Sequence, residues 1–415
     1  MAALPAYRFR PDPPSLLDMA RRGLSDVASV MPEAILDRAA IKLPGPGAPL
    51  VVADPDLART VLNDKSGQFV RDRFTRRLFR RTWDRGLAGA EGEPWQAQRR
   101  AAAPFFKQSA MAGRIDGFRS NAAEVLATRP GGGLVKLDDL ARRIVARVVF
   151  TQLVAAASEV DPDEVAGLMP AYIARVASFG AADIAPLPEA WIDRLRGLRR
   201  DPSVARIRDL AREVANRRAA GGPRGDLIDL LAVVGPVEDN VRGLLPAAMD
   251  TTVAGLTWTL YCLAAMPEWQ DRLGGAEPAE LQSFVKEVLR LFPPAPQLVR
   301  ASSRAGELGG FRVRKGQPVL VSIYAMQRHR GHWRDPDSFL PERFVPPAPR
   351  PDAYMPFGTG PRMCIAAQFA ELEIASIAAE VLARFRIAPE GSPPEVSLLV
   401  ATRPVGGVVA TLIPR

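Results

Sequence analysis

The chain has 415 residues, a length that would allow two or three domains, and a formal net charge of +9 at pH 7 that comes almost wholly from arginine. Its two cysteines and the lack of a secretory pattern at its N-terminus favour a reducing compartment, and no apolar run approaches the roughly 18 residues that span a bilayer. A basic chain can bind nucleic acid, but we recognise no interleaved aromatic-basic recognition element in the sequence. We therefore expect neither a membrane anchor nor nucleic acid as a partner.

The hydrophobic pattern predicts a mainly α-helical chain with minor β-structure. Residues from about Leu137 to Leu291 have the pattern of helices. Short strands are expected at 49–53, 311–321 and 396–412. Neither a Walker loop nor a dinucleotide-binding Gly-x-Gly-x-x-Gly motif occurs, so we expect no fused flavin or nicotinamide domain.

A predicted helix within Glu91–Arg100 carries an indole and a guanidinium on one face. Trp95 and Arg99 are four residues apart, so the indole N–H and the guanidinium can converge on one anion. An ordinary amphipathic helix with a solvated arginine is the alternative interpretation.

The segment Val241–Leu263 predicts another helix, because its apolar side chains recur in steps of three and four residues. Pro246 lies inside this helix and has no backbone N–H, so a kink is expected there. A patch of small side chains on the helix would let a flat macrocycle approach the backbone. The patch consists of Ala247, Ala248, Thr251, Thr252, Ala254 and Gly255. Thr251 can bond the carbonyl one turn back or hold a water molecule, and on pattern alone Asp250 and Thr251 could equally be a solvated edge.

Glu287 and Arg290 place a carboxylate and a guanidinium on one helix face, at the i,i+3 spacing. On most helices such a pair lies on the surface and contributes less than about 1 kcal/mol. The pattern alone does not separate that case from a buried pair.

The run Phe357–Ala366 is the most informative in the chain. Gly358 and Gly360 permit backbone angles that other residues avoid, and Pro361 stiffens the segment, so a tight, rigid loop is predicted. Apolar residues at helical spacing follow, which puts Cys364 at a helix N-terminus. There the helix dipole and unpaired N–H groups stabilise a thiolate.

Four chemical roles can be considered for Cys364. It could be a small buried hydrophobe, as an isolated cysteine usually is. Zinc needs several nitrogen or sulfur ligands, yet the other candidates are only Cys262, His329 and His332. A Cys-His nucleophile pair is conceivable, but neither histidine has the flanking sequence of a base. A single axial thiolate on haem iron needs just one cysteine, and this role fits the loop best.

This run resembles the haem-ligand loop of the cytochrome P-450 superfamily, Phe-x-x-Gly-x-x-x-Cys-x-Gly, with Ala366 in place of the last glycine. The resemblance implies the cytochrome P-450 fold, mainly α with small β-sheets. Haem b would lie between the oxygen-activating helix and the Cys-ligand helix. It further implies a single haem-thiolate domain over 1–415 without a fused reductase, of a soluble bacterial type in the cytoplasm.

The resemblance also assigns residues to the cofactor and to oxygen activation. The cofactor-binding residues would be Trp95, Arg99, Arg300, Phe357, Arg362 and Cys364, with Cys364 as the iron ligand. The run from Ala247 to Thr252 resembles the family's segment Ala-Gly-x-(Asp/Glu)-Thr-(Thr/Ser). Asp250 would be the catalytic acid and Thr251 the catalytic hydroxyl. Ala248 departs from the family by replacing the glycine.

Two further sets of residues follow from the resemblance. Glu287 and Arg290 would form a buried triad with Arg343 of the Pro-Glu-Arg-Phe motif at Pro341–Phe344. Parts of 67–87, 247–248, 295–299 and 398–402 would line the substrate pocket. The pocket residues named by this alignment are Ala247, Ala248, Ala295, Leu298, Val299 and Leu399.

The implied activity is that of a haem-thiolate monooxygenase, which inserts one oxygen atom of O2 into a lipophilic small molecule by hydroxylation or epoxidation. The largely aliphatic lining does not choose among a fatty acid, a terpenoid and a steroid. Electrons would come from a ferredoxin or flavodoxin with its NAD(P)H-dependent reductase, and an acidic partner would explain the basic charge. A peroxide-driven peroxygenase or decarboxylase is one alternative. That class commonly has an arginine where this chain has Asp250 and Thr251. A non-catalytic haem-binding protein, which would need no acid-alcohol pair, is the other.

Overall fold

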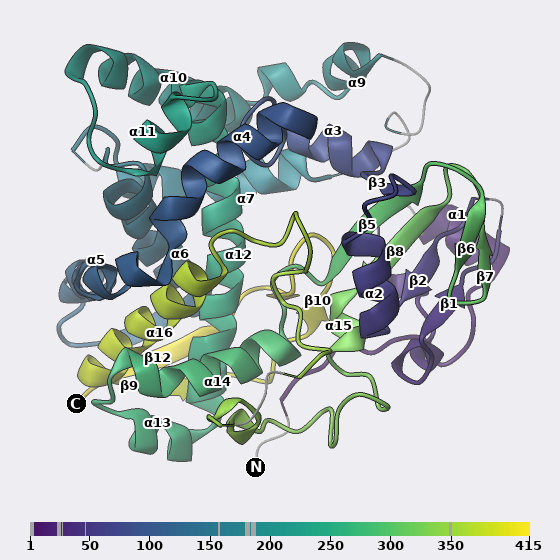
Figure 1. Ribbon diagram of the computed structural model, residues 1–415. Coiled ribbons are helices and arrows are strands. Elements are labelled where there is room, and N and C mark those ends of the chain that lie inside the picture. The colour runs from purple at the N-terminus through teal and green to yellow at the C-terminus, as the bar shows by residue number, and fades with distance from the viewer. Residues whose placement is uncertain are drawn as a thin grey trace. The chain divides into compact units, whose positions relative to one another are not determined.

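The computed structural model describes residues 4–22, 26, 28–45, 47–156, 158–178, 183, 188–347 and 351–415. The chain forms two compact units, each built from segments that are far apart in the sequence (Figure 1). Unit 1 comprises Met1–Thr75, Ser283–Cys364 and Ser392–Gly407. Unit 2 comprises Arg76–Gln282, Ile365–Gly391 and Val408–Arg415.

Unit 1 contains a five-stranded sheet in the order β1-β2-β8-β5-β3. Its strands are β1 (Ala40–Lys42), β2 (Leu50–Val52), β8 (Pro318–Ser322), β5 (Gln297–Ser302) and β3 (Phe69–Val70). β2 and β8 are parallel and the other neighbours are antiparallel. All side chains of β2 are buried. The strand is therefore apolar throughout and does not alternate apolar with polar residues.

The remaining elements of unit 1 are short. Two hairpins are formed by β6 (Gly306–Leu308) with β7 (Phe311–Val313) and by β10 (Val396–Ser397) with β11 (Arg403–Pro404). The helices of this unit are α1 (Leu16–Arg22), α2 (Pro55–Leu62), α15 (Ile323–Met326) and most of α14 (Pro278–Leu291). Asp54 caps α2, since its side chain accepts hydrogen bonds from the N–H groups of Asp56 and Leu57.

Unit 2 is mainly helical. Its helices are most of α3 (Arg73–Thr82), then α4 (Gly92–Ala102), α5 (Ile115–Ala127), α6 (Leu137–Val148), α7 (Pro162–Val176), α9 (Glu189–Leu195), α10 (Pro202–Gly221), α11 (Leu227–Ala232), α12 (Val237–Ala265), α13 (Pro267–Leu273) and α16 (Ala367–Arg384). A three-stranded antiparallel sheet joins β4 (Gly133–Lys136), β12 (Val409–Pro414) and β9 (Phe385–Pro389). The 29-residue α12 runs through the unit and packs against α6, α10 and α16 (Figure 1).

The predicted fold class, mainly α with small sheets, is confirmed. The expected strands at 49–53, 311–321 and 396–412 appear as β2, as β7 with β8, and as β10 to β12. The sequence did not predict β1, β3, β6 and β9. It also did not predict β4, which occupies a glycine-rich stretch between two helices, or β5, which follows a proline-rich one. In the described part of the chain, no helix has the length and apolar character needed to cross a membrane.

Candidate functional site

The loop that carries Cys364 is held by its own backbone hydrogen bonds. The N–H of Gly358 donates to the carbonyl of Met355 over 2.9 Å, and the N–H of Met363 donates to that of Gly360 over 3.0 Å. The N–H of Cys364 donates to the carbonyl of Phe357 over 3.0 Å. These bonds fix the cysteine relative to Phe357 before any ligand is bound.

The two loop glycines are required by conformation. Gly358 and Gly360 have φ angles of 71° and 79°, in the left-handed region. A Cβ atom on Gly360 would lie 2.1 Å from Oδ1 of Asn63 and 2.6 Å from the carbonyl oxygen of Leu62. The loop therefore packs closely on the end of α2, and the predicted tight turn is present.

Cys364 is exposed, whereas Gly358 and residues 353–356 are buried. The neighbouring Met363 is also 38% exposed, although it is apolar. Among the described residues, no group of three or more His, Cys, Asp or Glu side chains could share a metal ion. A single accessible sulfur beside exposed apolar surface fits a flat group that brings its own metal ligands, as haem does. The residues present thus fit haem.

Strand β5 lies against this loop in unit 1. A Cβ on Gly358 would come 3.1 Å from Cδ1 of Leu298, so Leu298 of the predicted pocket contacts the ligand loop. Arg300 is two residues further along β5 and therefore on the same face of the strand. Its Nη1 donates to the carbonyl of Val299 over 2.9 Å.

Glu287 and Arg290 form a bidentate ion pair on α14. The two guanidinium-to-carboxylate distances are both 2.8 Å, and both side chains are fully buried. Arg343 lies 3.5 Å from the same carboxylate, and the N–H of Leu340 donates to it over 2.8 Å. The pKa of Arg343 is lowered, mainly by burial and next by the nearby positive charge of Arg290. The structure therefore brings the three predicted triad residues together.

Gln327 connects the triad to the ligand loop, and sequence reasoning missed it. Its side-chain amide donates to the carbonyls of Leu289 and Arg290, while its carbonyl oxygen accepts from the N–H of Met355 over 2.9 Å. Arg290 donates back to the backbone carbonyl of Gln327 over 2.9 Å. Met355 in turn accepts from Gly358 in the loop. A buried glutamine after a short helix carries no motif, so no pattern in the sequence singles it out.

In unit 2, α12 is buried along most of its length but exposes one stripe. Ala247 and Thr251 are exposed, and Ala248 and Asp250 are partly exposed. The following residues of the helix, 252–260, are buried. Positions 247 and 251 are one turn apart and share a face. The hydroxyl of Thr251 donates to the carbonyl of Ala247 over 2.8 Å, as expected for a threonine in a helix. Pro246 lies inside the continuous helix.

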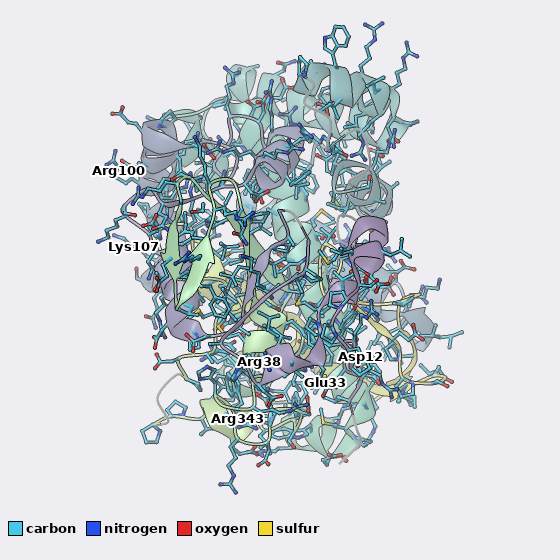
Figure 2. All side chains as sticks on the ribbon, turned by 90° about the vertical axis from the view of Figure 1, so that its right-hand side faces the viewer. Asp12, Glu33, Arg38, Arg100, Lys107 and Arg343 are labelled. Carbon is cyan, nitrogen blue, oxygen red and sulfur yellow. The ribbon has the colours of Figure 1, made fainter. Side chains whose placement is uncertain are left out.

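Trp95 and Arg99 lie on α4, also in unit 2. The guanidinium carbon of Arg99 is 6.0 Å from the centroid of the Trp95 ring, and both side chains are partly buried. The predicted convergence of the two side chains on one face is present. Arg100 on α4 and Lys107 beyond it are exposed, and Figure 2 shows both extending outward.

The other predicted pocket residues belong to unit 1. Thr402 binds the segment before β5, because its N–H donates to the carbonyl of Pro294 over 3.2 Å. This bond holds the β10–β11 hairpin next to Ala295. Leu399, in that hairpin, is 52% exposed.

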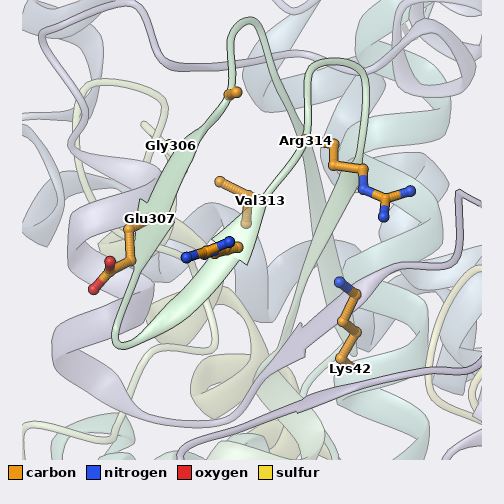
Figure 3. Close-up of a pocket in the computed structure, with 7 residues that line it drawn as sticks. Lys42, Gly306, Glu307, Val313 and Arg314 are labelled. Atoms are coloured by element: carbon orange, nitrogen blue, oxygen red, sulfur yellow. The ribbon is translucent and has the colours of Figure 1, made fainter.

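A surface pocket of about 580 Å³ lies at the β6–β7 hairpin of unit 1 (Figure 3). Its lining residues are Lys42, Ala305, Gly306, Glu307, Arg312, Val313 and Arg314. None of them is a predicted site residue, so this pocket is separate from the candidate site.

Comparison with known proteins finds similarity to one family in the C-terminal part of the chain. A family model described as "Cytochrome P450" matches residues 280–409. The protein LUTEIN DEFICIENT 5, chloroplastic, of Arabidopsis thaliana is 26% identical, over 84% of this chain and 67% of that protein. The mitochondrial 25-hydroxyvitamin D-1 alpha hydroxylase of Rattus norvegicus is 29% identical, over 82% of this chain and 79% of the hydroxylase. Cytochrome P450 4V2 of Mus musculus is 35% identical, over 41% of this chain and only 37% of its own length.

Solved structures agree over nearly the whole chain. A six-coordinated cytochrome P450 from Thermus thermophilus is 25% identical, with a TM-score of 0.69 over 91% of this chain and 95% of that structure. A zebra fish cytochrome P450 solved with progesterone is 23% identical, with a TM-score of 0.73 over 91% of this chain and 96% of that structure. The fold of the chain is therefore the cytochrome P450 fold.

Proposed function

We propose that the chain is a cytochrome P450 monooxygenase that uses haem b to insert one oxygen atom of O2 into a lipophilic small molecule, by hydroxylation or epoxidation. The observation that carries the proposal is the exposed Cys364 in a loop that its own backbone hydrogen bonds hold in place. Bound haem supplies the one-electron and O2 chemistry, with the thiolate favouring O–O cleavage.

The chain's own residues would bind the cofactor and deliver protons. Cys364 would bind the iron. Contacts to the rest of the haem would come from Phe357 and from the cationic or donor side chains Trp95, Arg99, Arg300 and Arg362. The exposed hydroxyl of Thr251 would hold a water molecule once it turns away from the Ala247 carbonyl, and the partly exposed carboxyl of Asp250 would pass protons to it.

Electrons would come from a ferredoxin or flavodoxin with its NAD(P)H-dependent reductase. Support comes from the net charge of +9 and from exposed cations such as Arg100 and Lys107, which would attract an acidic partner. We further propose that residues 1–415 act as a single haem-thiolate domain, in a soluble protein of the bacterial type in the cytoplasm. Among the relatives named above, the curated ones are plant and mammalian, and the Thermus thermophilus structure is bacterial.

The substrate would be lipophilic and would meet Ala247, Ala248, Ala295, Leu298, Val299 and Leu399. These side chains are aliphatic and none of them is charged. The rat relative is named as a hydroxylase of 25-hydroxyvitamin D.

Product analysis tests the reaction class. The haem-loaded protein would be incubated with candidate lipophilic substrates, once with NADPH, a ferredoxin and its reductase, and once with hydrogen peroxide alone. Product that requires NADPH and O2 is expected. Product with peroxide alone, and none with NADPH, would instead support the peroxygenase alternative. Haem binding without product in either arm would support a carrier or sensor.

A further inference from the structure

The pocket at the β6–β7 hairpin lies on the surface and is formed wholly by residues of unit 1 (Figure 3). Its volume of about 580 Å³ is within the range of about 300–1,000 Å³ that is usual for small-molecule sites. All of its lining residues belong to the described part of the chain. Its space and its lining groups therefore determine which ligand it can hold.

The hairpin that forms the pocket is anchored at its tip and at its base. At the tip, Gly309 has a φ angle of 54°, and a Cβ there would lie 2.7 Å from Cδ2 of Leu57 on α2. At the base, the side chain of Gln317 accepts from the N–H of Arg314 over 3.0 Å and donates to the carbonyl of Ala48 over 3.2 Å. Ala48 is in the loop that joins β1 to β2. These contacts hold Arg314 in a fixed place relative to β1.

Four of the lining side chains carry a charge, and three of these are cations. Glu307 and Arg312 are directly opposite each other in the hairpin, so their charges offset each other. Lys42 on β1 and Arg314 just after β7 are both exposed, and neither side chain forms an ion pair with a described residue. The pocket therefore presents two positive charges that the described lining does not neutralise.

Another exposed arginine of unit 1 shows how the chain neutralises a surface cation. Arg330 lies 2.6 Å from Glu33 and 2.6 Å from Asp37, so two carboxylates flank its guanidinium. No described carboxylate flanks Lys42 or Arg314 in this way. Their charges are thus available to a ligand.

The positions of these two side chains indicate the chemistry of that ligand. Figure 3 shows Lys42 and Arg314 extending toward one another. A ligand between their ends meets both positive charges at one place, so its negative charges belong on a single group. A phosphate monoester carries a charge of about −1.5 to −2 at pH 7 and has three acceptor oxygens. Arginine binds phosphate through two parallel N–H groups, and lysine binds it as a point charge.

We propose that this pocket binds the phosphate monoester of a small polar molecule, with Lys42 and Arg314 as the anion-binding residues. The apolar side chains of the lining are only Ala305 and Val313, which favours a polar ligand over a lipid. The site shares no residue with the candidate haem site. The inference is independent of the proposed monooxygenase function, because the contacts that support it all lie in unit 1 around β1, α2 and the hairpin.

The test is calorimetric titration of the haem-loaded protein, at low ionic strength, with glucose 6-phosphate, glucose 6-sulfate and glucose. Glucose 6-phosphate is expected to bind at one site per chain, glucose 6-sulfate more weakly because it carries a single negative charge, and glucose not at all. Lys42→Gln and Arg314→Gln should each weaken binding of the phosphate about 10- to 100-fold, the usual effect of losing a charge-assisted hydrogen bond. Circular dichroism checks that the variants fold, which is expected because both side chains are exposed.

Lys315→Gln is the matched control. Lys315 is exposed and follows Arg314 directly, but it does not line the pocket. The control removes the same net charge and should leave binding of the phosphate unchanged. An equal loss in Lys315→Gln would show only general attraction to a basic surface and would overturn the proposal.

Two further results would also overturn it. One is equal affinity of the wild type for glucose 6-phosphate and glucose 6-sulfate, or no binding of either. The other comes from vesicles that contain phosphatidic acid. Binding to these vesicles that requires Lys42 and Arg314, in a protein that does not bind glucose 6-phosphate, would replace the small molecule with a lipid phosphate.

Discussion

Replacing Arg290 with leucine removes the cation from a carboxylate that is fully enclosed by protein. Glu287 would retain only the N–H of Leu340 and the more distant Arg343 as partners. The carbonyls of Pro336 and Ser338 would each lose a guanidinium donor as well. The variant therefore leaves both a buried charge and buried carbonyls without their partners.

The expected loss of stability follows from these contacts. Breaking a buried ion pair on one side typically costs about 3–5 kcal/mol, and each buried acceptor that stays unsatisfied adds about 1–3 kcal/mol before relaxation. We expect Arg290→Leu to lower the free energy of unfolding by about 4–6 kcal/mol, a large part of the roughly 5–15 kcal/mol of a typical domain. Replacing both Arg290 and Glu287 with leucine should lower the free energy of unfolding by less than this single change does, because no unpaired charge stays buried.

Urea unfolding followed by circular dichroism measures these differences, and haem content shows their effect on the ligand loop. Little haem-loaded protein is expected for Arg290→Leu and for Glu287→Gln, with Arg343→Lys intermediate. Arg59→Leu is the control, since Arg59 pairs with the exposed Asp352 and should change stability by less than about 1 kcal/mol. A loss below about 1 kcal/mol for Arg290→Leu, or a double variant less stable than the single one, would refute the reasoning.

Cys364→Ser should abolish the red-shifted Soret band of the reduced, CO-bound protein, and Cys262→Ser should leave it intact; the reverse pattern would reassign the ligand. Thr251→Ala should keep substrate affinity but divert electrons to hydrogen peroxide, and Asp250→Asn should slow the whole catalytic cycle. Each substitution should lower product formation by about 10²- to 10⁴-fold. Parallel assays of NADPH, peroxide and product check this, and coupled turnover in Thr251→Ala would contradict it. Reduction by an acidic ferredoxin should slow with added salt, because charges are screened beyond about 8–10 Å at moderate ionic strength; a salt-independent rate would exclude electrostatic docking. Burial raises the pKa of Glu373 well above its usual value, so the folded state holds a proton that the unfolded state loses, and stability should fall as pH rises above about 4.5. Glu373→Gln should flatten the fall in urea midpoint between pH 5 and pH 8, and an unchanged slope would contradict this.

Short motifs made the ligand loop and the triad predictable. The Phe357–Ala366 run specifies its own turn, because glycines at fixed positions and a following helix are local properties of the chain. The i,i+3 spacing of Glu287 and Arg290 likewise required that they share a face. Resemblance to a known family then supplied Arg343, which is far from them in sequence.

Features that depend on long-range contacts were not predictable in this way. Gln327 becomes a link only because α14 and the segment before the loop pack on either side of it. The 67–87 stretch carried no recognisable code in the sequence, since nothing in Arg77 or Arg81 distinguishes them from the exposed arginines of α3. Their burial depends on Asp183 and α9, about a hundred residues away in the chain.

The parallel pairing of β2 with β8 has a consequence during synthesis on the ribosome. Val52 pairs with Val321, so β2 waits for a partner strand that is made some 270 residues later. At about 5–20 residues per second, that delay is on the order of 15–50 seconds. Throughout this time the apolar strand Leu50–Val52 has an open edge, which favours non-native pairing. Unit 1 can complete its sheet only late in translation, whereas the helices of unit 2 between α4 and α12 can form while that wait continues.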